Sequence, residues 1–121
     1  MNARTFIAAC AAAAVLAQAP AAGHHAYDAN YVRDTGSIEG VVVEVFWANP
    51  HVHYYLEVTN DGGGTTIWDV ESDNLGVMER AGWTSETLQV GDRVRVSGRL
   101  GREGRSRLAL DLSSLERLDD D

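Results

Sequence analysis

The sequence has one cysteine, two prolines and no lysine among its 121 residues. The cysteine, Cys10, stands in an apolar run near the N-terminus, so the rest of the chain holds no thiols that could pair as a disulfide. Cations are also scarce, because 10 arginines stand against 18 acidic residues and the formal net charge is −8. A surface this acidic repels phosphate backbones, and we therefore expect no nucleic-acid partner.

The first 23 residues have the layout of a secretory leader. Arg4 precedes an apolar run from Phe6 to Ala17, and small residues occupy positions 21–23. Cleavage after Gly23 leaves 121 − 23 = 98 residues, and cleavage after position 21 or 22 stays open. The run is shorter than the roughly 20 apolar residues of a membrane span. The sequence therefore predicts a signal peptide over 1–23, a periplasmic or secreted product, and no transmembrane anchor in the mature chain.

The mature part divides into an arm and a strand-rich region. Residues 24–36 show no hydrophobic period and are expected to form an N-terminal arm. Residues 37–118 carry five segments with strand patterns and one with apolar residues at a spacing of three, which is typical of a helix. The expected strands are Ser37–Trp47, His51–Thr59, Thr65–Glu71, Arg93–Leu100 and Ser106–Leu112, and the expected helix is Ser72–Ala81, capped by Ser72 or Asp73.

Five strands with a helix between the third and the fourth are the plan of an OB-fold. A plain antiparallel sheet with one helix across it would show the same element order. An open sheet would leave two unpaired edges, whereas a barrel closes them. We therefore predict an all-β domain over 37–118, a five-stranded OB-fold-like barrel with one short helix.

Short motifs in a fixed order resemble an uncharacterised family of small exported bacterial proteins, DUF6152. The motifs are His24-His25-Ala26-Tyr27, Asn49-Pro50-His51, Trp68 with Glu71, Gly82-Trp83, and the Gly-Asp-x-Val-x-Val-x-Gly run from Gly91 to Gly98. Ala26-Tyr27 replaces the family's Ser-Phe, and His53 lies outside the family pattern. The resemblance implies export and an OB-like fold, and it implies no established activity.

The second and third expected strands place histidines opposite carboxylates. A hairpin symmetric about Gly62 pairs His53 with Glu71, Tyr55 with Asp69, and His51 with Asp73. Directly opposed Cβ atoms in such a pair lie about 4.5–5.5 Å apart. Two imidazoles and a carboxylate on one strand face can bind Zn²⁺ or Cu²⁺. The same pattern also describes a solvated strand face whose charges pair across the ladder.

The N-terminus of the mature chain offers a second set of metal ligands. Cleavage after Gly23 would expose the amine and the imidazole of His24 together, with His25 or His51 supplying a third nitrogen. Cleavage one or two residues earlier would place His24 or His25 third in the chain, where amine, backbone nitrogens and imidazole form a square-planar set that suits Cu²⁺ or Ni²⁺. The alternative is a tail that carries histidine without binding metal. Copper is the favoured ion, ahead of zinc and nickel.

Three functions are compatible with these residues. The first is an exported, non-enzymatic OB-like module that handles a metal ion through His24, His25 and His51, with His53 and Glu71 as further candidates. The second is an accessory domain that binds a protein or a small ligand without metal. The third is an enzyme, which we disfavour because the mature chain has no cysteine, no Gly-x-Ser-x-Gly and no phosphate-binding loop.

Overall fold

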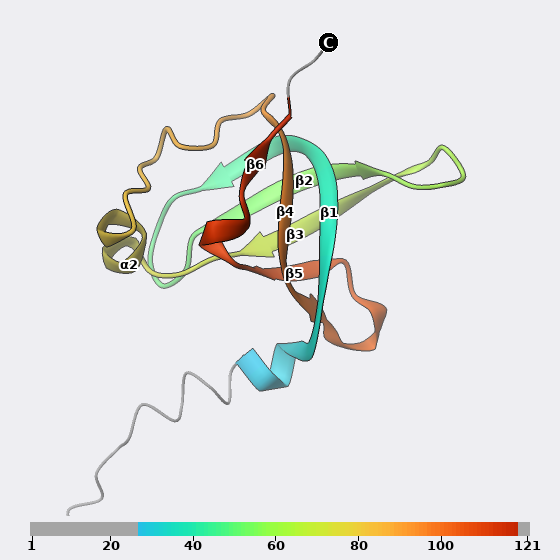
Figure 1. The fold of residues 1–121 in the computed structure, drawn as a ribbon, viewed down its shortest axis with the longest axis horizontal. Helices are drawn as coiled ribbons and strands as arrows, with labels where there is room; N and C mark the ends of the chain where they lie inside the picture. The colour runs from blue at the N-terminus through green and yellow to red at the C-terminus, as the bar shows by residue number, and fades with distance from the viewer. Residues whose placement is uncertain (1–26, 119–121) are drawn as a thin grey trace, which may run out of the picture.

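A computed structural model describes residues 27–118 of the chain. The predicted signal peptide, His24 and His25 lie outside the described residues. Residues 27–30 are helical, and the remaining helices are α2 (Leu75–Arg80) and the single 3₁₀ turns η1 (Arg102–Gly104) and η2 (Leu112–Ser114). The strands are β1 (Tyr31–Phe46), β2 (His53–Thr59), β3 (Thr65–Glu71), β4 (Arg93–Gly101), β5 (Arg107–Leu110) and β6 (Glu116–Arg117) (Figure 1).

Five of the strands form a closed ring. β1 pairs with β2, β2 with β3, β5 with β4, and β4 with β1, all antiparallel, while β3 and β5 pair in parallel. The short strand β6 adds to β4. The ring and the position of α2 between β3 and β4 confirm the predicted β-rich barrel of five strands with its helix after the third.

The long first strand makes the ring possible, because its two halves pair with different partners. Val41 lies between Glu57 of β2 and Arg93 of β4. Gly40 stands next to this junction, and a Cβ atom there would lie 2.6 Å from the Glu57 carbonyl oxygen. Glycine therefore permits the close approach of β1 and β2 where β1 arches over the barrel (Figure 1).

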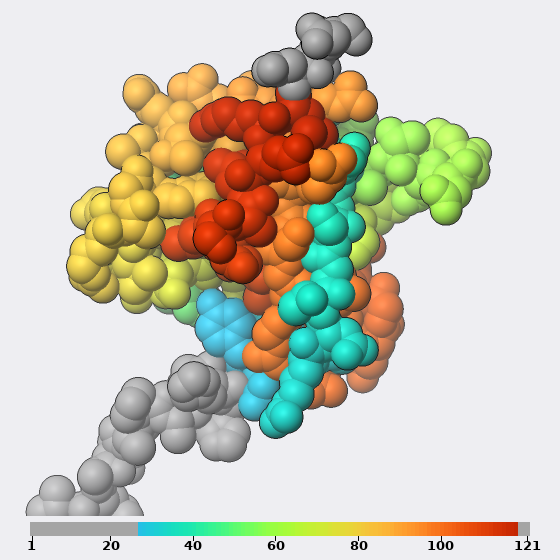
Figure 2. All heavy atoms as spheres, viewed as in Figure 1, coloured from blue at the N-terminus to red at the C-terminus, as the bar shows by residue number. Residues whose placement is uncertain are grey.

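The core fills the inside of the ring through period-two alternation. The inward residues are Ile38 and Val42 of β1, Tyr54 and Leu56 of β2, Val70 of β3, Val94 and Val96 of β4, and Leu108 of β5. Met78, Trp83 and Leu88, from α2 and the following loop, join the same cluster. The Trp83 ring lies 6.0 Å from the Tyr54 ring. The β2–β3 turn projects away from this body (Figure 2).

The first strand begins earlier than expected. Residues 31–36, which the sequence analysis assigns to an arm, are strand, and residues 27–30 are helical. Tyr31 is fully buried and pairs with Gly101, while Thr35 pairs with Arg99. The register of β1 against β4 shifts between Tyr31 and Thr35. This irregularity removes the alternation of apolar residues on which the strand prediction depends.

The helix also differs at its start. It begins at Leu75 rather than Ser72, because Asn74 is the N-cap and its side chain accepts a hydrogen bond from Val77 N at 2.9 Å. Asn49, from the loop before β2, accepts a second hydrogen bond from Leu75 N at 2.9 Å. The Asn-Pro-His motif is thereby joined to α2. No helix within residues 27–118 is long and apolar enough to cross a membrane.

Candidate functional site

The β2–β3 hairpin has the predicted register from His53–Glu71 to Thr59–Thr65, and the ladder ends before the predicted His51–Asp73 pair. His53 lies opposite Glu71, and Tyr55 lies opposite Asp69. The side chains, however, meet diagonally: His53 Nδ1 lies 2.6 Å from Asp69 Oδ1, and His51 Nδ1 lies 3.3 Å from Glu71 Oε1. Diagonal neighbours across an antiparallel pair are within reach of long side chains. Each of the two histidines therefore has one carboxylate partner.

Glu71 is the most enclosed charge of this cluster, with 8 % of its surface exposed. Its Oε2 atom accepts hydrogen bonds from the Tyr31 hydroxyl at 3.2 Å and from Arg107 Nη2 at 2.9 Å. The guanidinium of Arg107 also lies 5.3 Å from the centre of the Tyr31 ring, and its Nε atom is 3.8 Å from Asp69 Oδ2. A buried carboxylate requires partners of this kind. Arg107 therefore neutralises charge on both acids.

Tyr31 and Arg107 are the members of the cluster that sequence reasoning missed. The parallel pairing of β5 with β3 places Arg107 beside Asp69. Tyr31 belongs to the cluster because it is the first residue of β1. Leu108 and Leu110 form the apolar face of this strand, and Arg107, which alternates with them, is therefore expected to face outward. No local pattern specifies which strand lies next to Arg107.

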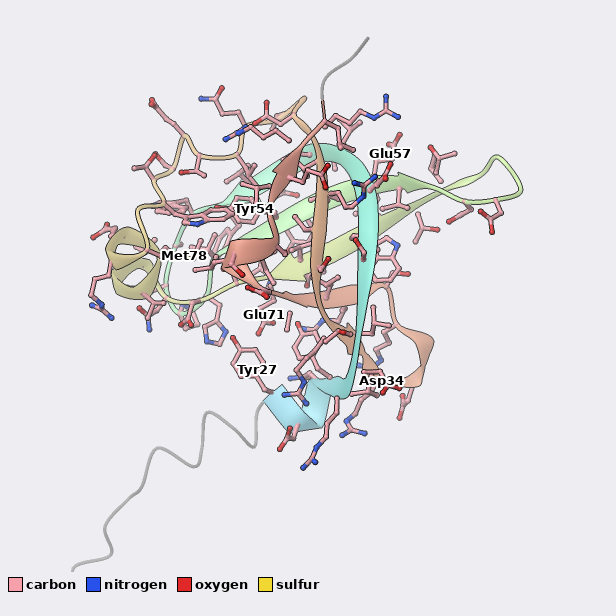
Figure 3. The ribbon with its side chains drawn as sticks, in the orientation of Figure 1. Tyr27, Asp34, Tyr54, Glu57, Glu71 and Met78 are labelled. Carbon is pink, nitrogen blue, oxygen red and sulfur yellow. The ribbon has the colours of Figure 1, made fainter. Side chains whose placement is uncertain are left out.

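Tyr27 connects the N-terminal residues to this cluster. Its ring lies 6.3 Å from the His51 ring and 5.9 Å from the Tyr31 ring, and its hydroxyl donates to the Ser72 carbonyl at 3.4 Å. Figure 3 shows the Tyr27 side chain rising from the helical residues toward the side of the barrel that carries Glu71. Burial, followed by the charges of Asp73 and Glu71, raises the pKa of Tyr27 above its ordinary value.

An arginine of β4 holds the residues around Tyr27 in place. Arg99 Nη2 donates to Asp28 Oδ1 at 2.9 Å, and Arg99 Nε donates to the Val32 carbonyl at 2.8 Å. The hydrogen bond from Arg99 holds the pKa of Asp28 below its usual range. Because one guanidinium bonds both the helical residues and the start of β1, the place of Tyr27 beside His51 depends on β4.

The contacts of His51 and His53 determine which of their ring atoms could bind a metal ion. Within residues 27–118, no group of three His, Cys, Asp or Glu side chains is arranged to hold a metal ion. His51 and His53 each present Nδ1 to a carboxylate, which leaves Nε2 as the ring atom that could bind a ligand. Glu71 is shared by His51, Tyr31 and Arg107, an arrangement that suits orientation of the imidazole. The other two predicted ligands, His24 and His25, lie outside this range.

Comparison with known proteins gives a family and no activity. No curated protein matches the chain. A family model described as "Family of unknown function (DUF6152)" matches residues 11–109. The match runs through β1 to β4 and most of β5, and it includes Tyr31, His51, His53, their carboxylate partners and Arg107. The chain therefore belongs to the DUF6152 family, whose function is unknown.

Proposed function

We propose that this protein is an exported, OB-like binding module that handles copper, with His51 as the ligand from the barrel and His24 and His25 as the ligands from the N-terminus. The observation that carries the proposal is the pairing of His51 Nδ1 with Glu71 beside the Tyr27 ring. Export rests on the leader-like residues 1–23.

The His51–Glu71 pair prepares the imidazole for a metal. When Nδ1–H donates to the carboxylate, the neutral ring carries its lone pair on Nε2. Metal-bound histidines usually have this second hydrogen bond to a carboxylate or a carbonyl. Glu71 then acts as a positioning residue, since Arg107 and Tyr31 already occupy its other oxygen. His53, the first residue of β2, has the same relation to Asp69 and is the second imidazole of the barrel.

Tyr27 joins the segment that carries the N-terminal histidines to the surroundings of His51. His25 precedes Tyr27 by two residues, so its Cα lies within roughly 7 Å of that of Tyr27, since one residue spans at most about 3.6 Å. The Tyr27 ring is itself 6.3 Å from His51. After cleavage at Gly23, the free amine and the His24 imidazole would belong to the same segment. A set of amine and imidazole nitrogens suits Cu²⁺.

A copper titration of the untagged protein, purified from the periplasm, tests the proposal. The intact mass identifies the N-terminus, and the d–d absorption band reports copper bound to nitrogen. We expect one copper per chain. Affinity should fall at least tenfold, about 1.4 kcal/mol, in the His24→Ala/His25→Ala double variant and also in His51→Ala.

The control variant is Asn60→Ala, in the β2–β3 turn, where Asn60 bonds only Thr66 and the turn backbone among the described residues. This variant should bind copper as the wild-type protein does. Copper affinity that is unchanged in the His24/His25 double variant would overturn the proposal.

A further inference from the structure

The outer face of β1, β2 and β3 exposes apolar side chains. The exposed large hydrophobic residues of the described chain are Val41, Val43, Phe46, Ile67 and Val90. All but Val90 belong to β1 or β3. The pairing register brings them together, because Val41 and Ile67 both lie opposite Glu57, and Phe46 lies opposite His53. We call these four apolar residues, with Glu44, Glu57, His53 and Tyr55, the outer β1–β3 face.

A β-bulge increases the number of side chains on this face. The register of β1 against β2 shifts between Val42, which pairs with Leu56, and Glu44, which pairs with Tyr55. The extra residue, Val43, is exposed, as is Glu44, so two consecutive residues of β1 point outward. Bulges re-aim side chains in this way. The exposed valine is therefore a result of strand geometry, and it extends the apolar surface toward Phe46.

The charges on the outer β1–β3 face are negative. Glu39, Asp69 and Glu71 have arginine partners on neighbouring strands. Glu44 and Glu57, by contrast, have no ion-pair partner among residues 27–118. Both are exposed and lie on adjacent strands within the apolar surface. Two carboxylates without an ion-pair partner, set among exposed apolar side chains, favour a ligand that is both cationic and aliphatic.

Aromatic rings run along the same face. His53 stacks on Tyr55 with ring centres 6.2 Å apart, and its other neighbour, Phe46, meets it edge-on at 6.2 Å. Aromatic faces attract guanidinium groups, which stack on them as well as pair with carboxylates. Arginine therefore satisfies all three features of the face, because its stem is aliphatic and its head is both planar and positive.

We propose that the outer β1–β3 face binds an arginine-rich segment of a partner protein. A second copy of this chain fits poorly, because a symmetric contact would bring Glu44 and Glu57 of the two copies together. Nucleic acid is repelled by the same carboxylates. The face shares His53 with the candidate metal ligands, so its test is carried out with EDTA present and varies only Glu44, Glu57, Phe46 and Ile67, which supply no ligand to the proposed metal site.

The probe is a fluorescein-labelled peptide of alternating arginine and leucine, and the readout is fluorescence anisotropy with the untagged protein. We expect saturable binding that weakens about fivefold in Glu44→Gln/Glu57→Gln, the effect of losing two exposed ion pairs. A Phe46→Ser/Ile67→Ser variant should weaken binding without any change in net charge. Amide chemical shifts should move on β1, β2 and β3.

The matched control is Glu79→Gln/Glu86→Gln, which removes the same charge from exposed positions in α2 and the loop after it. This variant should bind within about twofold of wild type, since distant exposed charges are largely screened by salt. Equal loss in both charge variants would show attraction to net charge alone and would overturn the proposal. Absence of saturable binding, or a dimer that forms through this face in sedimentation, would also overturn it.

Discussion

At the scale of single residues, Tyr31 and Tyr54 form a matched pair. Both side chains are fully buried. The Tyr31 hydroxyl donates to Glu71, whereas the Tyr54 hydroxyl has no hydrogen-bond partner among the described residues. Removing a hydrogen bond to a buried charge costs about 1.5–3 kcal/mol, but removing an unpaired buried hydroxyl costs little. We expect Tyr31→Phe to lower the free energy of unfolding by about 2 kcal/mol and Tyr54→Phe to leave it unchanged or raise it.

Urea unfolding followed by tryptophan fluorescence measures both changes, and each variant serves as the control for the other because the same atom is removed. Comparable destabilisation in the two variants would contradict the assignment of Tyr31 as a donor to Glu71.

At the scale of elements, the attachment of the N-terminal residues to the barrel depends on Arg99 of β4. Its guanidinium bonds Asp28 and the carbonyls of Tyr31 and Val32. We expect Arg99→Ala to accelerate amide hydrogen exchange in the first residues of β1, because these carbonyls lose their donor while the rest of the ladder stays paired. Mass spectrometry of peptides covering 27–36 makes the measurement.

The matched control for this prediction is Arg95→Ala on the same strand. Arg95 is paired with Glu39 and Glu116 on the surface, away from residues 27–36. Exchange over 27–36 should be that of wild type in this variant. An Arg99→Ala protein with unaltered exchange in the same peptides would show that Tyr27 keeps its place without the arginine.

At the scale of the whole molecule, the tyrosines limit stability in alkali. Burial is the leading cause that raises the pKa of all four, and the pKa of Tyr54 reaches about 12. The unfolded chain has tyrosine pKa values of about 10. Because the tyrosine pKa values are raised in the folded state, the contribution of these residues to the free energy of unfolding is fully present below about pH 10. This contribution is lost as the pH rises toward 12. We expect the free energy of unfolding to fall across this range.

Urea titrations at several pH values between about 9 and 12 follow this loss, with a limiting slope of about 1.4 kcal/mol per pH unit for each titrating tyrosine. Tyr54→Phe should show a shallower decline, because phenylalanine has no proton to lose. A decline as steep as that of wild type would rule out Tyr54 as a contributor.

Much of the candidate site follows from local pattern. The alternation of residues 51–59, the glycine-rich turn and the returning strand specify the hairpin register, and that register puts His53 opposite Glu71. The diagonal contacts of the histidines do not follow from register, because they depend on strand twist and on rotamers. Arg107 and Tyr31 reach Glu71 across 36 and 40 residues of sequence, so their contribution exists only once the ring has closed.

The sequence by itself determined the β-rich class, the order of the five strands, the helix after the third and the side of the hairpin that bears the histidines, since each depends on short-range periodicity and turn chemistry. The tertiary structure decided where β1 starts, that β3 and β5 run in parallel, and that Arg107 and Tyr31 enclose Glu71. It also gathered Val41, Val43, Phe46 and Ile67 on one face. These features join segments distant in the chain, and only packing and strand pairing bring such segments together.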